Sequence, residues 1–263
     1  MISFVAVGFV GVLLGVFGGG GSLLILPLLV YLVGLSPVEA TSYSLLIVGV
    51  AALIGAVDFL RKGLVNFSSV LGFGFPSIVG VFLTRTVLMH QIPDQLIDSE
   101  SFSLSKNTLV MGVFCIMVLG SSYSMIRKRP ERDETSEHRQ RLGITILAGF
   151  IVGLLTGFVG AGGGFLIVPA LMFLLHLPVR EAVATSLFVI ALKSVLGFLG
   201  DTFMLDDIEW WLLLKLTVAA VIGILLGVRL NRRIPAEKLK TSFGWVVLLM
   251  GGLILVREFL LPA

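Results

Sequence analysis

Apolar residues fall into eight long blocks along the chain, and short polar segments separate them. The blocks cover residues 2–35, 37–60, 67–89, 104–126, 142–176, 179–200, 209–229 and 241–261. A helix needs about 20 apolar residues to cross the hydrocarbon core of a bilayer. Six of the blocks have the length of one crossing, so the pattern predicts an all-α polytopic membrane protein.

The first and fifth blocks are too long for a single crossing, and each contains a cluster of glycines at its centre. A continuous helix over either block would measure about 50 Å, well beyond the thickness of the hydrocarbon core. The clusters are Gly18-Gly19-Gly20-Gly21 and Gly160-Ala161-Gly162-Gly163-Gly164. The sequence therefore predicts a helix–break–helix hairpin in each of these two blocks.

The two halves of the chain repeat each other at a shift of 142 residues. Apolar residues match easily by chance, but here glycines, prolines and a Glu-Ala pair also coincide in one register. The matched pairs include Gly18 with Gly160, Pro27 with Pro169, Glu39 with Glu181, Ser44 with Ser186 and Gly55 with Gly197. This pattern predicts an N-terminal repeat over residues 1–126, a charged linker over 127–141 and a C-terminal repeat over 142–263.

The basic residues predict how the chain is oriented in the membrane. Segments rich in Lys and Arg remain on the cytoplasmic side, and three such segments occur: Arg61-Lys62, the linker 127–141, and the cluster after residue 228. If all three are cytoplasmic, each half contains one hairpin and three single crossings. This odd number of crossings inverts the second half relative to the first. Inverted repeats with broken helices are typical of secondary transporters.

Composition excludes several other classes of protein. The chain is 57% hydrophobic and only 13% charged, and its mean hydropathy is +1.06, which is incompatible with a soluble globular domain. The net charge of +3 fits basic cytoplasmic loops, so we expect the lipid bilayer and no nucleic acid as partner. The sequence contains neither a GxSxG nor an HExxH motif and no metal-ligand spacing. We therefore expect no enzymatic activity, no metal and no cofactor.

The glycine clusters predict a site for an anion. A helix that restarts inside the membrane presents N–H groups and a positive dipole end to the break, and glycine lets the backbone approach a ligand closely. Two such breaks, one from each face, would place two positive helix ends near the centre of the bilayer. The alternative is that glycine only permits close helix crossing, as the GxxxG spacings of Gly11/Gly15, Gly153/Gly157 and Gly223/Gly227 indicate.

The candidate substrate-binding residues are the glycines of both breaks, hydroxyl residues beside them and one lysine. They are Gly18, Gly19, Gly20, Gly21, Ser22, Ser44, Gly160, Gly162, Gly163, Gly164, Thr185, Ser186 and Lys193. The hydroxyls, together with those of Thr41 and Ser42, either bind an oxyanion or bond back to helix carbonyls. Lys193 lies well inside the sixth block, where a charge either attracts substrate or finds a partner or the interface.

The other charged residues of the blocks have simpler interpretations. Arg85 and Lys215 lie closer to block ends, so we expect both to extend toward the membrane interface. Glu39 and Glu181 are equivalent in the two repeats, and both helix capping and proton coupling are compatible with their positions. Asp58 precedes Arg61-Lys62 and predicts a surface ion pair.

The duplicated segments resemble those of the TauE/SafE sulfite exporter family, also called the toluene sulfonate uptake permease group. The resemblance rests on GVLLGVFGGGGSLLILPLLVYLVGLSPVEATSYSLL and GLLTGFVGAGGGFLIVPALMFLLHLPVREAVATSLF. It implies transport of sulfite, thiosulfate, sulfoacetate or another sulfonate across the plasma membrane, usually of a prokaryote. The first repeat departs from the motif with Ser22 and Tyr43, where the second has Gly164 and Thr185.

Together, these features predict a secondary transporter that moves a small sulfur-containing or organic anion by alternating access. The alternative is an anion channel of the same architecture. Coupling to protons and coupling to the membrane potential are both compatible with the sequence, which specifies neither the oligomeric state nor the direction of transport.

Overall fold

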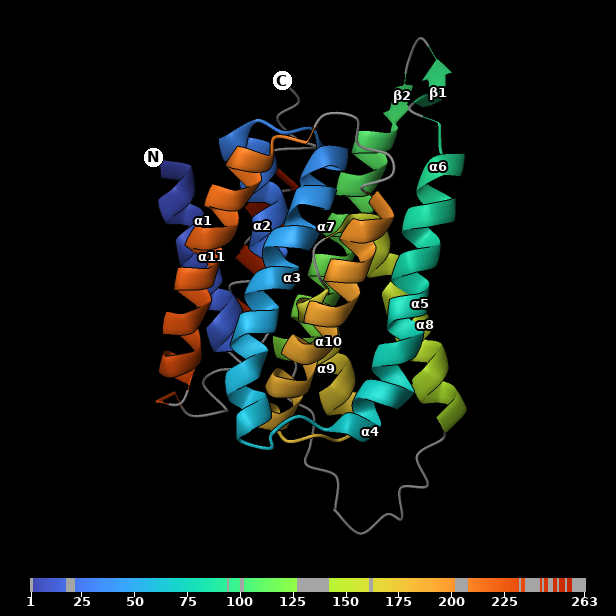
Figure 1. The fold of residues 1–263 in the computed structure, drawn as a ribbon. Coiled ribbons are helices and arrows are strands. Elements are labelled where there is room, and N and C mark those ends of the chain that lie inside the picture. The colour runs from blue at the N-terminus through green and yellow to red at the C-terminus, as the bar shows by residue number, and fades with distance from the viewer. Residues whose placement is uncertain are drawn as a thin grey trace.

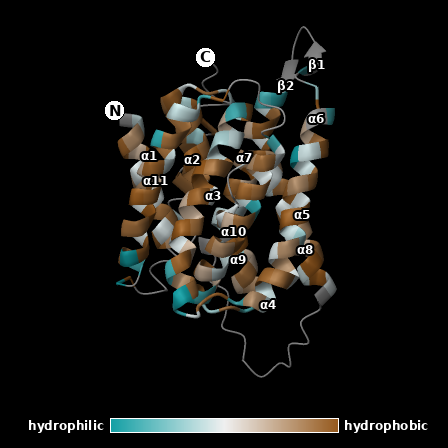
Figure 2. Cartoon of the chain, viewed as in Figure 1, coloured by the Kyte–Doolittle hydropathy of each residue, from teal (hydrophilic) through white to brown (hydrophobic). Residues whose placement is uncertain are grey.

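The protein is a bundle of apolar helices with hydrophilic residues gathered mostly near its two ends (Figures 1 and 2). The computed structural model describes residues 2–17, 22–93, 95–99, 102–126, 142–160, 163–201, 208–231, 233–234, 242, 244–245, 248–249, 251–253 and 255–256. Five described helices are long and apolar enough to cross a membrane. They are Pro37–Arg61, Phe67–Leu88, Lys106–Tyr123, Val179–Asp201 and Trp210–Asn231. The predicted all-α polytopic membrane fold is therefore confirmed.

The described helices of both glycine-rich blocks come as two separate arms, as predicted. In the first block, α1 (Ile2–Phe17) ends before the glycine cluster, and α2 (Ser22–Leu28) follows it and continues into a π-helical turn, η1 (Leu29–Val33). In the second block, α8 (Leu142–Val159) and α9 (Gly164–Leu174) flank the break. The four arms are shorter than a full crossing. In Figure 1, each pair of arms returns toward the end of the bundle from which it started.

Among the described residues, three long segments follow each other in the first half and two in the second. In the first half they are α3 (Pro37–Arg61), a rod over residues 67–91, and α7 (Lys106–Ile126). The rod consists of α4 (Phe67–Ser69), η2 (Val70–Gly74), α5 (Phe75–Leu83), η3 (Thr84–Leu88) and α6 (Met89–Gln91). In the second half the long helices are α10 (Val179–Asp201) and α11 (Trp210–Asn231). A small antiparallel hairpin, β1 (Gln95–Ser99) and β2 (Phe102–Ser105), precedes α7.

Glycines let the short arm of each half cross a long helix of the other half at backbone distance. A Cβ added to Gly11 of α1 would lie 2.3 Å from the carbonyl oxygen of Ala220 in α11. Likewise, a Cβ on Gly153 of α8 would lie 2.2 Å from the carbonyl oxygen of Ser77 in α5. Reciprocally, a Cβ added to Gly223 of α11 would lie 2.0 Å from the carbonyl oxygen of Gly8 in α1. The GxxxG spacings therefore serve close helix crossing, as predicted.

The central pair of helices, α3 and α10, runs in opposite directions. In Figure 1, α3 begins at the end of the bundle that carries the β-hairpin and finishes at the other end, whereas α10 follows the reverse course. A Cβ on Gly49 of α3 would lie 3.0 Å from the nitrogen of Val195 and 3.1 Å from the Cβ of Ser194 in α10. The repeat-equivalent residues Ala51 and Lys193 therefore lie close to the level at which these helices cross.

The helix ends satisfy several of the simpler predictions. The side chain of Glu39 accepts a hydrogen bond from the Ser36 nitrogen at 3.0 Å, and Ser36 Oγ accepts one from the Glu39 nitrogen, which completes a capping box for α3. This geometry confirms the capping role of Glu39. Asp58 and Lys62 form the predicted surface ion pair.

Candidate functional site

The break between α8 and α9 is built on glycines in a left-handed conformation. Gly160 has a φ of 70° and Gly163 a φ of 71°, backbone angles that residues with a Cβ rarely adopt. Neither position has room for a side chain, because a Cβ on Gly160 would lie 2.4 Å from the Cβ of Thr41. Gly164 begins α9 and is buried. The first N–H groups of a helix have no acceptor within it, so this break places polar backbone groups inside an apolar bundle.

Lys193 reaches this break from α10. Its Nζ donates a hydrogen bond of 2.8 Å to Thr156 Oγ1 on α8, and it would lie 2.6 Å from a Cβ on Gly163. The side chain is buried, with an exposed fraction of 1%. Along α10, Lys193 lies about 21 Å from the first residue and about 12 Å from the last. This ammonium group therefore does not reach the interface but ends against the interrupted hairpin.

The described residues provide no counter-charge for Lys193. Within the described part of the chain, ion pairs form only between Lys62 and Asp58 and between Arg85 and Asp201. A buried ion that lacks a partner costs several kcal/mol, and charges inside membranes mark functional sites by default. The surroundings of Lys193 therefore favour binding of an anion.

A second polar cluster lies on the other side of the same break, and it centres on Arg85. Arg85 Nη1 donates hydrogen bonds of 3.0 Å to Thr41 Oγ1 and to Asp201 Oδ2. Ser42 Oγ donates a bond of 2.5 Å to the same carboxylate oxygen. Arg85 is only 1% exposed, so the expectation that it extends to the interface is wrong. The π-helical turn η3 contains Arg85, and burial against Asp201 at the end of α10 holds the side chain inside the bundle.

The predicted hydroxyl residues have distinct local roles. The single O–H of Ser44 lies within hydrogen-bond distance of two carbonyl oxygens, that of Thr41 at 2.9 Å and that of Gly160 in the break. Ser186 Oγ bonds back to Val183 at 2.9 Å. Thr185 Oγ1 accepts a bond of 2.9 Å from the Asn66 nitrogen, which anchors the loop before α4. Ser44 therefore contacts the break between α8 and α9.

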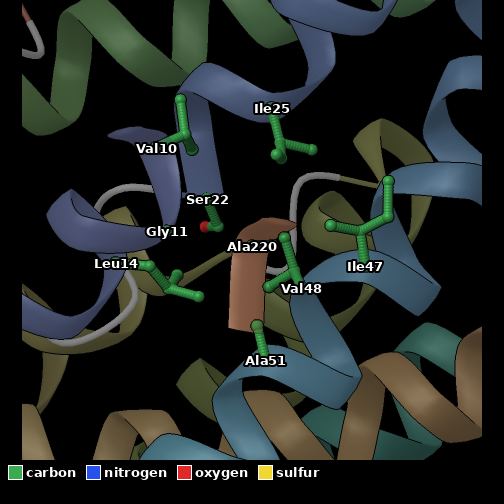
Figure 3. Close-up of a pocket in the computed structure, with 9 residues that line it drawn as sticks. All are labelled: Val10, Gly11, Leu14, Ser22, Ile25, Ile47, Val48, Ala51 and Ala220. Carbon is green, nitrogen blue, oxygen red and sulfur yellow. The ribbon is translucent and has the colours of Figure 1, made fainter. Parts of the chain in front are cut away.

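The described residues at the corresponding place in the first half are mostly apolar. A small cavity there is lined by residues of α1, α2, α3 and α11 (Figure 3), namely Val10, Gly11, Leu14, Ser22, Ile25, Ile47, Val48, Ala51 and Ala220. Leu14 and Ala51 stand where the second half has Thr156 and Lys193. Two of the residues that line the cavity are therefore the repeat equivalents of the hydrogen-bonded pair Thr156 and Lys193. Ser22 borders it, whereas the predicted site residues Gly18, Gly19, Gly20, Gly21 and Gly162 lie outside the described residues.

The structure thus brings together Gly160, Gly163, Gly164, Ser44 and Lys193 from the predicted set. It adds Arg85, Asp201 and Thr156, which the sequence analysis did not select. Thr156 lies near the end of α8, which otherwise consists of apolar residues, glycines and one other threonine, Thr145. The place of Thr156 shortly before the glycine cluster could have drawn attention to it. Asp201 and Arg85 gave no signal of their pairing, because 116 residues separate them in the chain.

Comparison with known proteins gives matches over almost the whole chain. The family described as Sulfite exporter TauE/SafE matches residues 3–254. A probable membrane transporter protein of Xylella fastidiosa (strain Temecula1) is 31% identical over 96% of this chain and 93% of its own length. The probable membrane transporter protein YunE of Bacillus subtilis is 27% identical over 95% of this chain and 96% of its own. Another such protein, MJ0441 of Methanocaldococcus jannaschii, is 26% identical over 94% of this chain and 92% of its own. No solved structure matches the chain.

Proposed function

Because the chain belongs to the TauE/SafE family of membrane transporters, we propose that it carries a small sulfur-containing or organic anion across the cell membrane by alternating access. Sulfite, thiosulfate, sulfoacetate and other sulfonates are the candidate substrates. All of them present negatively charged oxygen atoms that accept hydrogen bonds from N–H and O–H groups. The proposed site is the break between α8 and α9, with Lys193 as its central cation.

One observation carries this proposal: the buried ammonium group of Lys193 lies at the break without a carboxylate partner among the described residues. An anion that binds beside it would supply the missing charge and would accept hydrogen bonds from the ammonium and from the start of α9. The interaction is strong in an apolar surrounding, because few water molecules screen it there.

Alternating access is the mechanism that inverted repeats favour, because exchanging the conformations of the two repeats exchanges the side on which the site opens. The opposite courses of α3 and α10 support an inverted relationship. So does the reciprocal packing of each short arm on a long helix of the other half. The crossing of α3 and α10 near Ala51 and Lys193 favours a site at mid-depth.

The described basic residues support one cytoplasmic face. Arg61 is the last residue of α3 and Lys62 follows it, and Arg229 lies in the last turn of α11. Figure 1 shows these two helix ends at the same end of the bundle, opposite the β-hairpin. We infer that this end faces the cytoplasm, and that the hairpin and the start of α3 face the outside.

Transport assays in proteoliposomes test the proposal. Vesicles that contain the wild-type protein are expected to take up at least one of sulfite, thiosulfate and sulfoacetate in a saturable manner, and to show counterflow. The Lys193→Gln variant should lower the apparent affinity by at least about 30-fold, since removing one member of a buried charge pair costs 2 kcal/mol or more.

The matched control is Lys215→Gln, which removes an equal charge from an exposed lysine whose Nζ lies 4.8 Å from the ring centroid of Trp211. This variant should transport as the wild type does. Unchanged affinity in Lys193→Gln would refute the proposed site. Currents far above carrier turnover, without saturation or counterflow, would indicate a channel instead.

A further inference from the structure

Arg85 has an unoccupied hydrogen-bonding edge inside the protein. Its Nη1 is paired with Thr41 and Asp201, but Nε and Nη2 have no hydrogen-bond partner among the described residues. The N–H groups of Nε and Nη2 point from the same edge of the planar guanidinium group, so they form one fork of two donors. Unpaired buried donors are rare in proteins because each one costs free energy. A charged group with a whole free edge therefore requires an explanation.

This free edge faces the break that also receives Lys193. Nη2 of Arg85 would lie 2.5 Å from a Cβ on Gly160, whereas Nζ of Lys193 would lie 2.6 Å from a Cβ on Gly163. The two cations thus contact the same short segment at positions three residues apart. Only glycine leaves space for both cationic groups beside the backbone of this segment.

The partners of Nη1 hold the guanidinium in a fixed orientation. Asp201 is 5% exposed and accepts hydrogen bonds from both Arg85 and Ser42. Thr41 Oγ1 donates to the carbonyl oxygen of Val38 at 2.7 Å while it accepts from Arg85. These bonds restrain Nη1 and leave the opposite edge available. Asp201 compensates only one of the two buried cations, so the cluster of Arg85, Asp201 and Lys193 has an excess of one positive charge.

We propose that the Nε–Nη2 edge of Arg85 is a second oxyanion-binding element of the transport path, with Asp201 as its positioning residue. This inference rests on the proposed function and specifies the chemistry of its site. A planar fork of two N–H donors matches two oxygen atoms of a sulfite, sulfonate or carboxylate group. The backbone of Gly160 covers the edge in this conformation, so an anion reaches it when the broken hairpin shifts relative to η3.

The position of Arg85 also gives it a place along the path. Asp201 ends α10, about 12 Å along the helix from Lys193, and Thr41 lies in the first turn of α3. Arg85 therefore lies between Lys193 and the end of the bundle that carries the β-hairpin. An anion that moves between Lys193 and that end passes the Arg85 fork.

Binding measurements on the purified full-length protein separate this role from a purely structural one. Sulfite, thiosulfate and sulfoacetate serve as probes, and the thermal unfolding of each variant is recorded with and without them. The variant Arg85→Gln/Asp201→Asn removes both members of the ion pair and preserves their shapes, so the fold should keep about its wild-type stability. Its affinity for the anion should fall by at least about 30-fold.

Arg85→Lys provides a second test, because it keeps the charge and the ion pair with Asp201 but lacks the planar fork. We expect about a tenfold loss of affinity. Wild-type affinity in the double variant, or in Arg85→Lys, would overturn the inference and leave the Lys193 site intact. If the wild-type protein binds none of the three anions, the proposed function fails first, and the role of Arg85 fails with it.

Discussion

Replacement of Lys193 by methionine should stabilise the protein and abolish anion binding. Methionine has a similar length and no charge, so Lys193→Met removes a buried ammonium that lacks a carboxylate partner within the described structure. Replacing buried ionic groups by apolar residues of similar volume stabilises proteins by about 1–4 kcal/mol. The lost hydrogen bond to Thr156 costs about 1 kcal/mol, and Thr156 Oγ1 retains its bond of 3.3 Å to Gly153. The net gain is about 0–3 kcal/mol.

Thermal unfolding with and without sulfite, thiosulfate or sulfoacetate measures both effects. At an anion concentration 100 times its Kd, the wild-type protein should gain about 2.7 kcal/mol of stability, whereas the variant should gain none. A variant that is less stable than the wild type by several kcal/mol would show that the lysine serves the fold. A variant that anions still stabilise would show that binding does not need the ammonium group. Either result refutes the reasoning.

The remaining predictions concern the helix crossings, the break and the orientation. Gly11→Ala should destabilise the fold by about 1–3 kcal/mol, since its Cβ would lie 2.3 Å from a carbonyl oxygen of α11. Gly120 has open space around it, so the free energy of unfolding of Gly120→Ala should lie within about 0.5 kcal/mol of that of the wild type. Equal melting temperatures of the two variants would contradict the close crossing of α1 and α11. Gly160→Ala should lower transport at least tenfold (about 1.4 kcal/mol) through strain at φ 70°, and normal uptake would exclude a role of this backbone. In a background without the native cysteine, Ser103→Cys should react with impermeant maleimide from outside and Ser136→Cys only from inside. The reverse labelling pattern would show that the predicted orientation in the membrane is wrong.

Much of the fold followed from the sequence because it depends on lengths and spacings. The block lengths alone required interruptions at Gly18–Gly21 and Gly160–Gly164, since no bilayer accommodates a helix of about 50 Å. The shift of 142 residues also identified Ala51 as the repeat equivalent of Lys193, and that difference is the reason why one half has a small apolar cavity and the other has a buried cation.

The role of Arg85 did not follow from the sequence. A charge near the end of an apolar block has two physical solutions, which are extension to the interface and pairing inside the bundle. Only the tertiary arrangement brings Asp201 to the arginine, because the two residues lie in different repeats. The hydroxyls posed a similar difficulty: Ser44 and Ser186 both lie within hydrogen-bond distance of the carbonyl oxygen three residues earlier, but nothing in the sequence signals the second contact of Ser44, which is with Gly160.

The exchange of short arms between the halves decides which parts of the protein can travel as units. Where a glycine brings backbone against backbone, as Gly11 does on α11 and Gly153 on α5, two helices cannot slide past each other without a steric clash. Helix α1 must therefore accompany α11, and α8 must accompany α5, in any change of shape. The rigid bodies of a transport cycle are consequently composed of segments from both repeats. A cut in the linker would leave two fragments, each lacking the partner that its own short arm needs.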